Sequence, residues 1–136
     1  MVAFLDTSFI LAVRNRDDTN HARADGLMKL LLEGKHGRIV VLDHVFDEAV
    51  TLALVRTRNK GIIADIGEFI LSSPRIKLLF TGEDRFNDSW QNFLQYFDQG
   101  LSFSDSALLT MERALGGKAI VATFDRTLAN LVRSLS

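Results

Sequence analysis

The chain has 136 residues, 47% of them hydrophobic, with 17 acidic and 16 basic residues and a formal net charge of −1. This is the size of one compact domain with a core of its own, and proteins that hold nucleic acid by charge alone are far more basic. The absence of cysteine excludes disulfides, thiolate nucleophiles and cysteine-ligated zinc.

The apolar runs of the chain are all short. None approaches the roughly 20 residues that a membrane-spanning helix needs, and the opening run lacks the basic flank of a signal peptide. One proline and nine glycines argue against linkers and low-complexity tails. We therefore expect a single domain over residues 1–136, located in the cytoplasm and not associated with a membrane.

The first strand is predicted at residues 2–5, where an uncharged apolar run stops at Asp6. A short helix over residues 8–14 follows at once, and after a polar turn at 15–20 a second helix includes residues 24–32. Residues 39–42, rich in β-branched side chains, are predicted to be the second strand. Asp43 is then predicted to cap a long helix to about residue 59, which Lys60 and Gly61 break.

The second half of the chain continues this alternation. A helix over residues 62–71 ends before Pro74, a third strand is predicted at 76–80, and a helix over 81–99 ends at Gly100. The next helix runs from Ser102 to residue 114, the fourth strand covers 119–122, and a last helix runs on to the C-terminus. Helices that alternate with nearly uncharged strands predict a three-layer α/β/α sandwich around a central parallel sheet.

Aromatic residues recur on one side of the helix predicted over residues 81–99. They are Phe86, Trp90, Phe93 and Phe97. Such rings can stack on bases, but their helical spacing favours packing in the core or against a second copy of the chain. The three histidines lack metal-ligand spacing, and we expect surface or capping roles for them: His21, His36 and His44.

Four acidic residues stand where a parallel sheet would bring them to one edge. Asp6 and Asp125 follow apolar strands, so both belong at the carboxyl edge of the sheet, where chemistry collects in open α/β folds. Asp105 lies at a helix start in a serine-rich turn, and Glu48 lies about one turn into the helix that leaves the second strand. We prefer Glu48 to Asp47 because, at about 100° per residue, Glu48 borders the apolar face of its helix.

Each acid also has a purely structural explanation when it is taken singly. Asp6, Asp105 and Asp125 occupy helix starts, where a carboxylate stabilises by on the order of 1 kcal/mol, and Ser102 with Asp105 fits the capping-box spacing. Glu48 alone suits a solvated helix position. Together, however, four carboxylates at one edge would raise each other's pKa unless a cation compensates. Mg²⁺ and Mn²⁺ are hard ions that suit such oxygen ligands.

Four segments, in this order along the chain, resemble the motifs of the PIN domain family. They are LDTSFIL at residues 5–11, DEAVTL at 47–52, LSFSDSA at 101–107 and ATFD at 122–125. The resemblance covers nearly the whole chain, and the most similar subgroup is the VapC-type toxins of toxin–antitoxin pairs. It implies a Mg²⁺- or Mn²⁺-dependent endoribonuclease with metal-binding and catalytic acids and supporting hydroxyl groups. The acids are Asp6, Glu48, Asp105 and Asp125, and the supporting residues are Thr7, Ser104 and Thr123, the last of which would orient the final acid.

The resemblance also implies partners: an RNA substrate, a small antitoxin protein and a second copy in a homodimer. Family members commonly have one more strand after the last helix, whereas this chain ends at Ser136 and leaves no room for a strand after the helix predicted there. We therefore expect four strands, with five as the alternative that the family suggests. The net charge of the chain is also less positive than we would expect for an enzyme that cuts RNA.

The mechanism that these residues predict is hydrolysis of a phosphodiester by a metal-activated water. Asp6 and Asp105 are the leading direct ligands, while Glu48 and Asp125 would hold metal-bound waters or a second ion, and one of these two would help to deprotonate the water. Three basic residues near the predicted site could contact RNA phosphates or be ordinary surface charges: Arg14, Arg16 and Arg126.

Two alternatives stay open. A phosphatase of the haloacid dehalogenase type also begins with a strand and an aspartate, but it needs a second aspartate two residues later, where this chain has Ser8. The other alternative is a PIN fold without catalytic activity that binds RNA or a partner protein. Loss of one of the four acids would favour that module, and none is lost.

Overall fold

A computed structural model describes residues 1–136. Its centre is a five-stranded parallel sheet in the order β3-β2-β1-β4-β5. The strands are β1 (Val2–Leu5), β2 (Arg38–Leu42), β3 (Ile76–Leu79), β4 (Ala119–Ala122) and β5 (Ser134–Leu135). β1, β2 and β4 are short apolar segments that are almost entirely buried, as expected for a parallel sheet covered on both faces.

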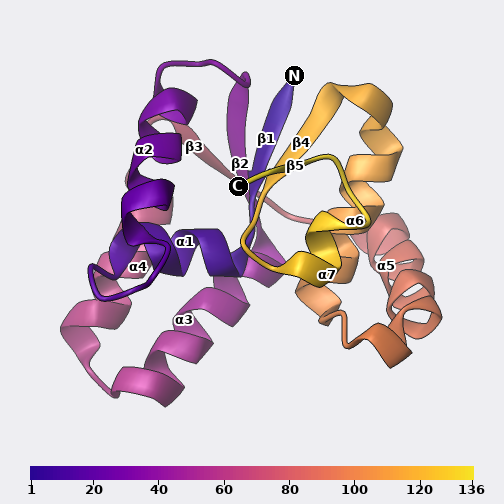
Figure 1. The fold of residues 1–136 in the computed structure, drawn as a ribbon. Coiled ribbons are helices and arrows are strands. Elements are labelled where there is room, and N and C mark those ends of the chain that lie inside the picture. Colours follow the sequence, from indigo (N-terminus) through magenta and orange to yellow (C-terminus); the bar gives the residue numbers. More distant parts are fainter.

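Helices cover both faces of this sheet, so the predicted α/β sandwich is confirmed (Figure 1). The helices are α1 (Thr7–Arg14), α2 (His21–Leu32), α3 (Asp43–Thr57), α4 (Lys60–Leu71), α5 (Glu83–Gln95), α6 (Phe103–Leu115) and α7 (Arg126–Ala129). Figure 1 shows α1 to α4 on one side of the sheet and α5, α6 and α7 on the other. None of the helices combines the length and the apolar character that crossing a membrane requires.

β1 lies where the order in which strands are added to the sheet reverses. From β1 the chain builds outward through β2 to β3, and after α5 and α6 it returns to the other side of β1 as β4. The connections that leave β1 and β4 therefore run to opposite faces of the sheet. In open α/β sheets this switch point leaves a crevice at the carboxyl edge, which is where ligands bind.

A fifth strand is present, so the alternative of five strands is confirmed, whereas the helix predicted from residue 126 to the C-terminus is wrong. α7 ends at Ala129, and β5 pairs with β4 in parallel. Val121 N–H donates to the Arg133 carbonyl (2.9 Å) and Thr123 N–H to the Leu135 carbonyl (3.0 Å). A strand of two residues is too short to show any hydrophobic alternation, which explains why the sequence pattern did not indicate it.

The boundaries of α3 also differ from the prediction. The N-cap of α3 is Leu42, and the Asp43 carboxylate accepts hydrogen bonds from Thr81 N–H (3.0 Å) and from the Thr81 hydroxyl group (2.8 Å). Asp43 thus joins the start of α3 to the segment after β3 and does not cap its own helix. The chain turns at Arg58, which has φ 47°, and Asn59 caps α4, so the break falls before Lys60 and Gly61.

The helix predicted over residues 81–99 is α5 followed by a 3₁₀ turn at Phe97–Gln99. Phe86, Trp90 and Phe97 are 47%, 45% and 71% exposed, so placing these rings in the core is wrong for all three. Phe93 stacks on Trp90 with ring centroids 5.9 Å apart. Contact with a second copy of the chain stays a prediction.

Candidate active site

Asp6 lies at the junction of β1 and α1 and is almost completely buried, with 1% of its surface exposed. Its backbone is extended (φ −91°, ψ 174°), and its Oδ1 accepts a hydrogen bond from Phe9 N–H at 2.8 Å. Asp6 is therefore the N-cap of α1. An extended strand that turns directly into a helix delivers this carboxylate to the carboxyl edge of the sheet.

Two hydroxyl groups hold the Asp6 carboxylate in place. Ser8 Oγ lies 2.7 Å from Oδ1 and 2.9 Å from Oδ2 and donates to the carboxylate, and Thr123 Oγ1 donates to Oδ2. Both hydroxyl groups also accept a backbone N–H, that of Phe124 at Ser8 and that of Asp125 at Thr123, each at 2.9 Å. This network ties the end of β1 to the end of β4.

The network changes the interpretation of both residues. Thr123 was predicted to orient the last acid, yet its hydroxyl group contacts the Asp6 carboxylate and reaches Asp125 only through the backbone amide. Sequence reasoning did not include Ser8 among the site residues. The available signal was a hydroxyl residue two positions after a strand-end aspartate, a spacing that allows local hydrogen bonding to the carboxylate.

Asp105 lies in the first turn of α6 and is 7% exposed. The N-cap is Ser102, whose Oγ accepts a hydrogen bond from Asp105 N–H at 3.1 Å. The Asp105 carboxylate itself accepts no hydrogen bond from the protein, so the reciprocal half of the predicted capping box is absent. The residue is nearly buried, yet its carboxylate oxygens keep contact with solvent, so the carboxylate is free to take a ligand that the protein does not supply.

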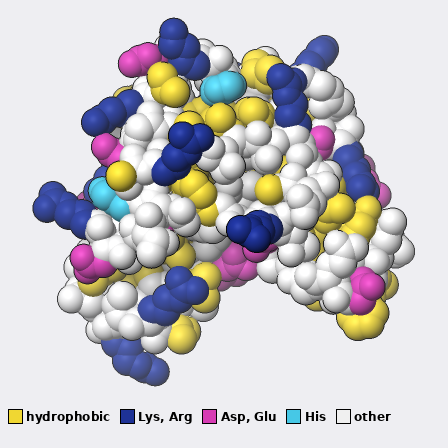
Figure 2. All heavy atoms as spheres, in the orientation of Figure 1, with side chains coloured by type: hydrophobic (Ala, Val, Ile, Leu, Met, Phe, Trp, Pro, Cys, Tyr) yellow, Lys and Arg dark blue, Asp and Glu magenta, His cyan; other side chains and the backbone are white.

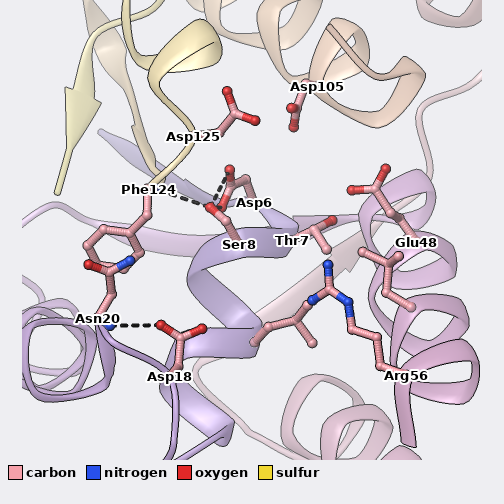
Figure 3. Close-up of a pocket in the computed structure, with 12 residues that line it drawn as sticks. Asp6, Thr7, Ser8, Asp18, Asn20, Glu48, Arg56, Asp105, Phe124 and Asp125 are labelled. Carbon is pink, nitrogen blue, oxygen red and sulfur yellow. Dashed lines mark hydrogen bonds between the residues drawn. The ribbon is translucent and has the colours of Figure 1, made fainter. Parts of the chain in front are cut away.

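Asp125 and Glu48 complete the acidic group. Asp125 is the N-cap of α7, and its Oδ1 accepts from Leu128 N–H at 3.0 Å. Glu48 extends from α3 across the pocket from Asp125, as Figure 3 shows. Asp47, by contrast, is exposed and outside this pocket, where it accepts a hydrogen bond from Thr51 at 3.1 Å.

All four acids line one open pocket at the carboxyl edge of the sheet, which we call the acid pocket (Figure 3). It has a volume of about 290 Å³ and is lined by Asp6, Thr7, Ser8, Leu11, Asp18, Asn20, Glu48, Leu52, Arg56, Asp105, Phe124 and Asp125. Thr123 is fully buried outside its lining, and Ser104 lines a neighbouring pocket, with its Oγ 3.1 Å from Ser102 Oγ. Asp18, Asn20 and Arg56 are lining residues that the sequence did not indicate.

The basic residues proposed from the sequence lie outside the acid pocket. Arg14 is paired with Asp65 through two hydrogen bonds of 2.6 and 3.0 Å. Arg16 lines a neighbouring pocket, and Arg126 lines neither of the two.

Burial and mutual repulsion perturb the acids of this pocket. The pKa of Asp105 is raised to about 8, first by burial and then by the negative charges of Asp6, Asp125 and Glu48. Burial also raises the pKa of Asp6 to about 6, although the hydrogen bonds from Thr123, Phe9 N–H and Ser8 act in the opposite direction. The protein thus gathers acidic side chains at this edge, and none of the four forms an ion pair within the protein. Figure 2 shows acidic atoms in the hollow between the helices on the two sides of the sheet.

The donor set fits a hard divalent cation that keeps part of its water shell. Four carboxylates converge, and the Asp105 carboxylate is free of hydrogen bonds from the protein. No three acidic or histidine side chains lie close enough to ligate one ion together. Mg²⁺ is bound in this way, through one or two direct carboxylates with waters between the ion and the remaining acids.

Comparison with known proteins agrees with this architecture. The sequence pattern of the PIN domain family matches residues 3–133. A VapC ribonuclease of Archaeoglobus fulgidus is 25% identical over 108 residues, which are 78% of this chain and 67% of that protein.

Solved structures show the same fold at low sequence identity. Mycobacterium tuberculosis VapC20, a toxin that cleaves the sarcin–ricin loop, has a TM-score of 0.79 at 20% identity, over 94% of this chain and 93% of its own. VapBC2 of Rickettsia felis, solved with a DNA fragment from its promoter, has a TM-score of 0.67 at 14% identity, over 99% and 98% of the two chains. With the family pattern spanning almost all of its length, the chain belongs to the PIN domain family.

Proposed function

We propose that residues 1–136 form one PIN domain that acts in the cytoplasm as a metal-dependent endoribonuclease, the toxin of a VapBC-type toxin–antitoxin pair. The observation that carries the proposal is the Asp105 carboxylate, which accepts no hydrogen bond from the protein and lines one open pocket together with Asp6, Glu48 and Asp125. The similarity to a VapC ribonuclease and to a toxin that cleaves the sarcin–ricin loop supports RNA as the substrate.

Mg²⁺ or Mn²⁺ is the proposed cofactor. A bound divalent ion would lower the pKa of a coordinated water and offset the charge that develops on phosphorus. Asp6, which Thr123 and Ser8 hold in one orientation, and Asp105, which no protein group binds, are the proposed direct ligands. Glu48 and Asp125 would hold waters beside the ion or a second ion, and one of the two would accept a proton from the attacking water.

The supporting residues have different parts in this proposal. Thr123 and Ser8 orient Asp6 through hydrogen bonds to its carboxylate. Thr7 lines the acid pocket directly. Ser104 acts indirectly, through its contact with Ser102 at the start of α6.

The decisive assay measures cleavage of structured RNA by the purified protein with Mg²⁺ or Mn²⁺. We expect Asp6→Asn and Asp105→Asn each to lose nearly all activity and EDTA to abolish it. Asp98→Asn removes an exposed carboxylate outside the acid pocket and is the matched control. Equal cleavage by the wild type and both pocket variants would reject this site. RNA binding without cleavage would favour the module that only binds.

We also propose a small antitoxin protein as a partner, because structural relatives of this chain were solved as VapBC assemblies from Rickettsia felis and Salmonella typhimurium. Expression of the chain alone should arrest growth, and coexpression of the small protein encoded beside it should restore growth.

A homodimer is proposed as well, through the exposed rings of Phe86, Trp90 and Phe97. Sedimentation of the wild type as a dimer and of Trp90→Lys as a monomer would support this interface.

A further inference from the structure

Arg56 is the one basic residue that lines the acid pocket. It lies on α3 eight residues after Glu48, with Leu52 between them, and all three line the pocket because positions four apart share a helix face. In Figure 3 its guanidinium group points from α3 toward Thr7 and the acids. A positive group therefore faces a site whose other charged members are all acidic.

The guanidinium group of Arg56 has no acidic or hydrogen-bond partner inside the protein. The ion pairs of the structure are Arg14–Asp65, Lys29–Asp25 and Arg85–Asp88, and Arg56 neither pairs with an acid within 4.0 Å nor donates a hydrogen bond. Arg14 shows the contrast, because its guanidinium group is held by Asp65 in a two-point contact. Arg56 thus keeps all five of its N–H donors for a ligand, in a fork that matches phosphate oxygens.

Arg56 also stands where the acid pocket meets a second one. The second pocket is lined by Leu11, Arg14, Asn15, Arg16, Asp17, Asp18, Ala53, Arg56, Thr57, Ile62 and Ile66, and it shares Leu11, Asp18 and Arg56 with the acid pocket. A continuous groove therefore leads from the acids past Arg56 to the loop that follows α1 and to the first half of α4. Arg16 and Arg56 are the basic residues of this groove that pair with no acid, although Asp17 and Asp18 also line it. Basic residues along a groove can bind the backbone of a single RNA strand.

We propose that Arg56 is a positioning residue that binds an RNA backbone phosphate next to the scissile one, so that the strand leaves the acid pocket across Arg56 into the second pocket. This rests on the proposed function. Five carboxylates line the acid pocket, Asp18 among them, and they repel a polyanion except where a cation intervenes. Arg56 supplies a fixed positive charge beside them. The substrate is then held by a contact that takes no part in the bond cleavage.

A structural role for Arg56 makes a different prediction. Arg56 is in the last turn of α3, where a positive side chain stabilises the helix terminus by about 0.3–1 kcal/mol. If this were its only role, Arg56→Gln would lower the melting temperature slightly and leave RNA binding unchanged. The test therefore measures binding and stability on the same variants.

Binding is measured by fluorescence anisotropy with a labelled stem–loop RNA that the wild type cleaves, in an Asp105→Asn background that leaves the RNA intact. We expect Arg56→Gln to weaken binding about tenfold, the loss of one charge-assisted contact. The slope of log K against log salt should fall by about 0.7–0.9, which corresponds to one phosphate. Arg56→Lys should keep the slope and recover part of the affinity. Arg75→Gln, which removes a charge from a pocket on the opposite edge of the sheet, should change neither quantity.

Kinetics with the native acids separates positioning from chemistry. Arg56→Gln should raise KM about tenfold and leave kcat within a factor of about two. Two results would overturn the proposal. If Arg56→Gln binds RNA with the affinity and salt slope of Arg75→Gln, Arg56 belongs to the helix terminus. If Arg56→Gln binds RNA normally and loses antitoxin binding, Arg56 belongs to the interface with the protein partner. If the wild type cleaves no RNA, the proposed function itself fails. If it cleaves RNA and Arg56→Gln behaves as the wild type, only the role of Arg56 fails.

Discussion

Thr123 is fully buried beside the acid pocket, and its single hydroxyl group serves two acids. It donates to the Asp6 carboxylate and accepts the backbone N–H of Asp125, so it fixes the distance between the ends of β1 and β4. Its hydrogen bond is also the largest of the effects that lower the pKa of Asp6 against the effect of burial. Thr123 thus contributes to both the position and the charge of Asp6.

Replacement of Thr123 by valine keeps the shape and removes both hydrogen bonds. We expect RNA cleavage at neutral pH to fall about 10- to 100-fold, as for other partners of metal-ligating groups, and the free energy of unfolding to fall by about 1–3 kcal/mol because Asp125 N–H loses its acceptor. The pKa of Asp6 should rise above about 6, which a titration of the metal-free protein followed by carbon-13 NMR would measure. Thr123→Ser retains the hydroxyl group and should recover most of the activity. An unchanged Asp6 pKa in Thr123→Val would contradict this role.

The positions of the acids were predictable from the sequence, whereas their partners were not. Asp6 and Asp125 follow uncharged apolar runs, and strands that end at a carboxylate can be identified from the local pattern alone. The contacts of Asp6 with Thr123 and of Asp43 with Thr81 join residues 117 and 38 positions apart. Only the folded sheet brings such residues together, and the same holds for Arg56, whose importance depends on which pocket its helix face lines.

At the scale of elements, four of the five strands were predictable because each is a run of four or five residues with at most one charged side chain. β5 consists of Ser134 and Leu135 alone, and it exists because β4 offers it unpaired backbone groups. The helix starts were less predictable, since a carboxylate at a helix start can bond elsewhere. Asp43 does so with Thr81, whereas Asp6 and Asp125 do cap their helices.

The entry into β2 depends on a glycine. Gly37 has φ 81°, and a Cβ atom there would lie 2.1 Å from the Met1 carbonyl oxygen, which accepts a hydrogen bond from Arg38 N–H at 3.2 Å. Gly37→Ala must therefore strain the backbone and push apart the paired starts of β1 and β2. We expect a loss of about 2–4 kcal/mol in the free energy of unfolding, measured by urea denaturation.

Gly26→Ala is the matched control for that experiment. Gly26 lies inside α2 with open space where a Cβ atom would be, so alanine there should stabilise by about 0.5–1 kcal/mol. The two substitutions add the same methyl group with opposite expected signs. An unchanged midpoint for Gly37→Ala would show that the start of β2 moves without cost and would contradict the argument.

For the whole molecule, burial of the acids and, after it, their mutual repulsion make the ionised acid pocket unfavourable for folding. The pKa values of Asp105 and Asp6 are raised to about 8 and about 6 from an ordinary 3.8. Between about pH 4 and pH 8 the folded protein therefore binds more protons than the unfolded chain. Stability must then decrease as pH rises through this window. A cation in the pocket would offset the repulsion, which couples metal binding to stability most strongly at the alkaline end.

This coupling predicts a melting experiment with and without metal. In EDTA the wild type should melt at a lower temperature at pH 8 than at pH 5. At pH 8 Asp105→Asn should melt at least about 3–6 °C above the wild type, the shift that about 1 kcal/mol produces in a chain of this size, and at pH 5 this difference should nearly vanish. Mg²⁺ should raise the melting temperature of the wild type far more at pH 8 than at pH 5. Asp105→Asn should lose most of that response, whereas Asp98→Asn, which alters an exposed carboxylate, should retain it. Two joint observations in EDTA would contradict this prediction: the wild type is equally stable at both pH values, and Asp105→Asn is no more stable than the wild type at pH 8. These results would show that the acids of the pocket do not oppose folding.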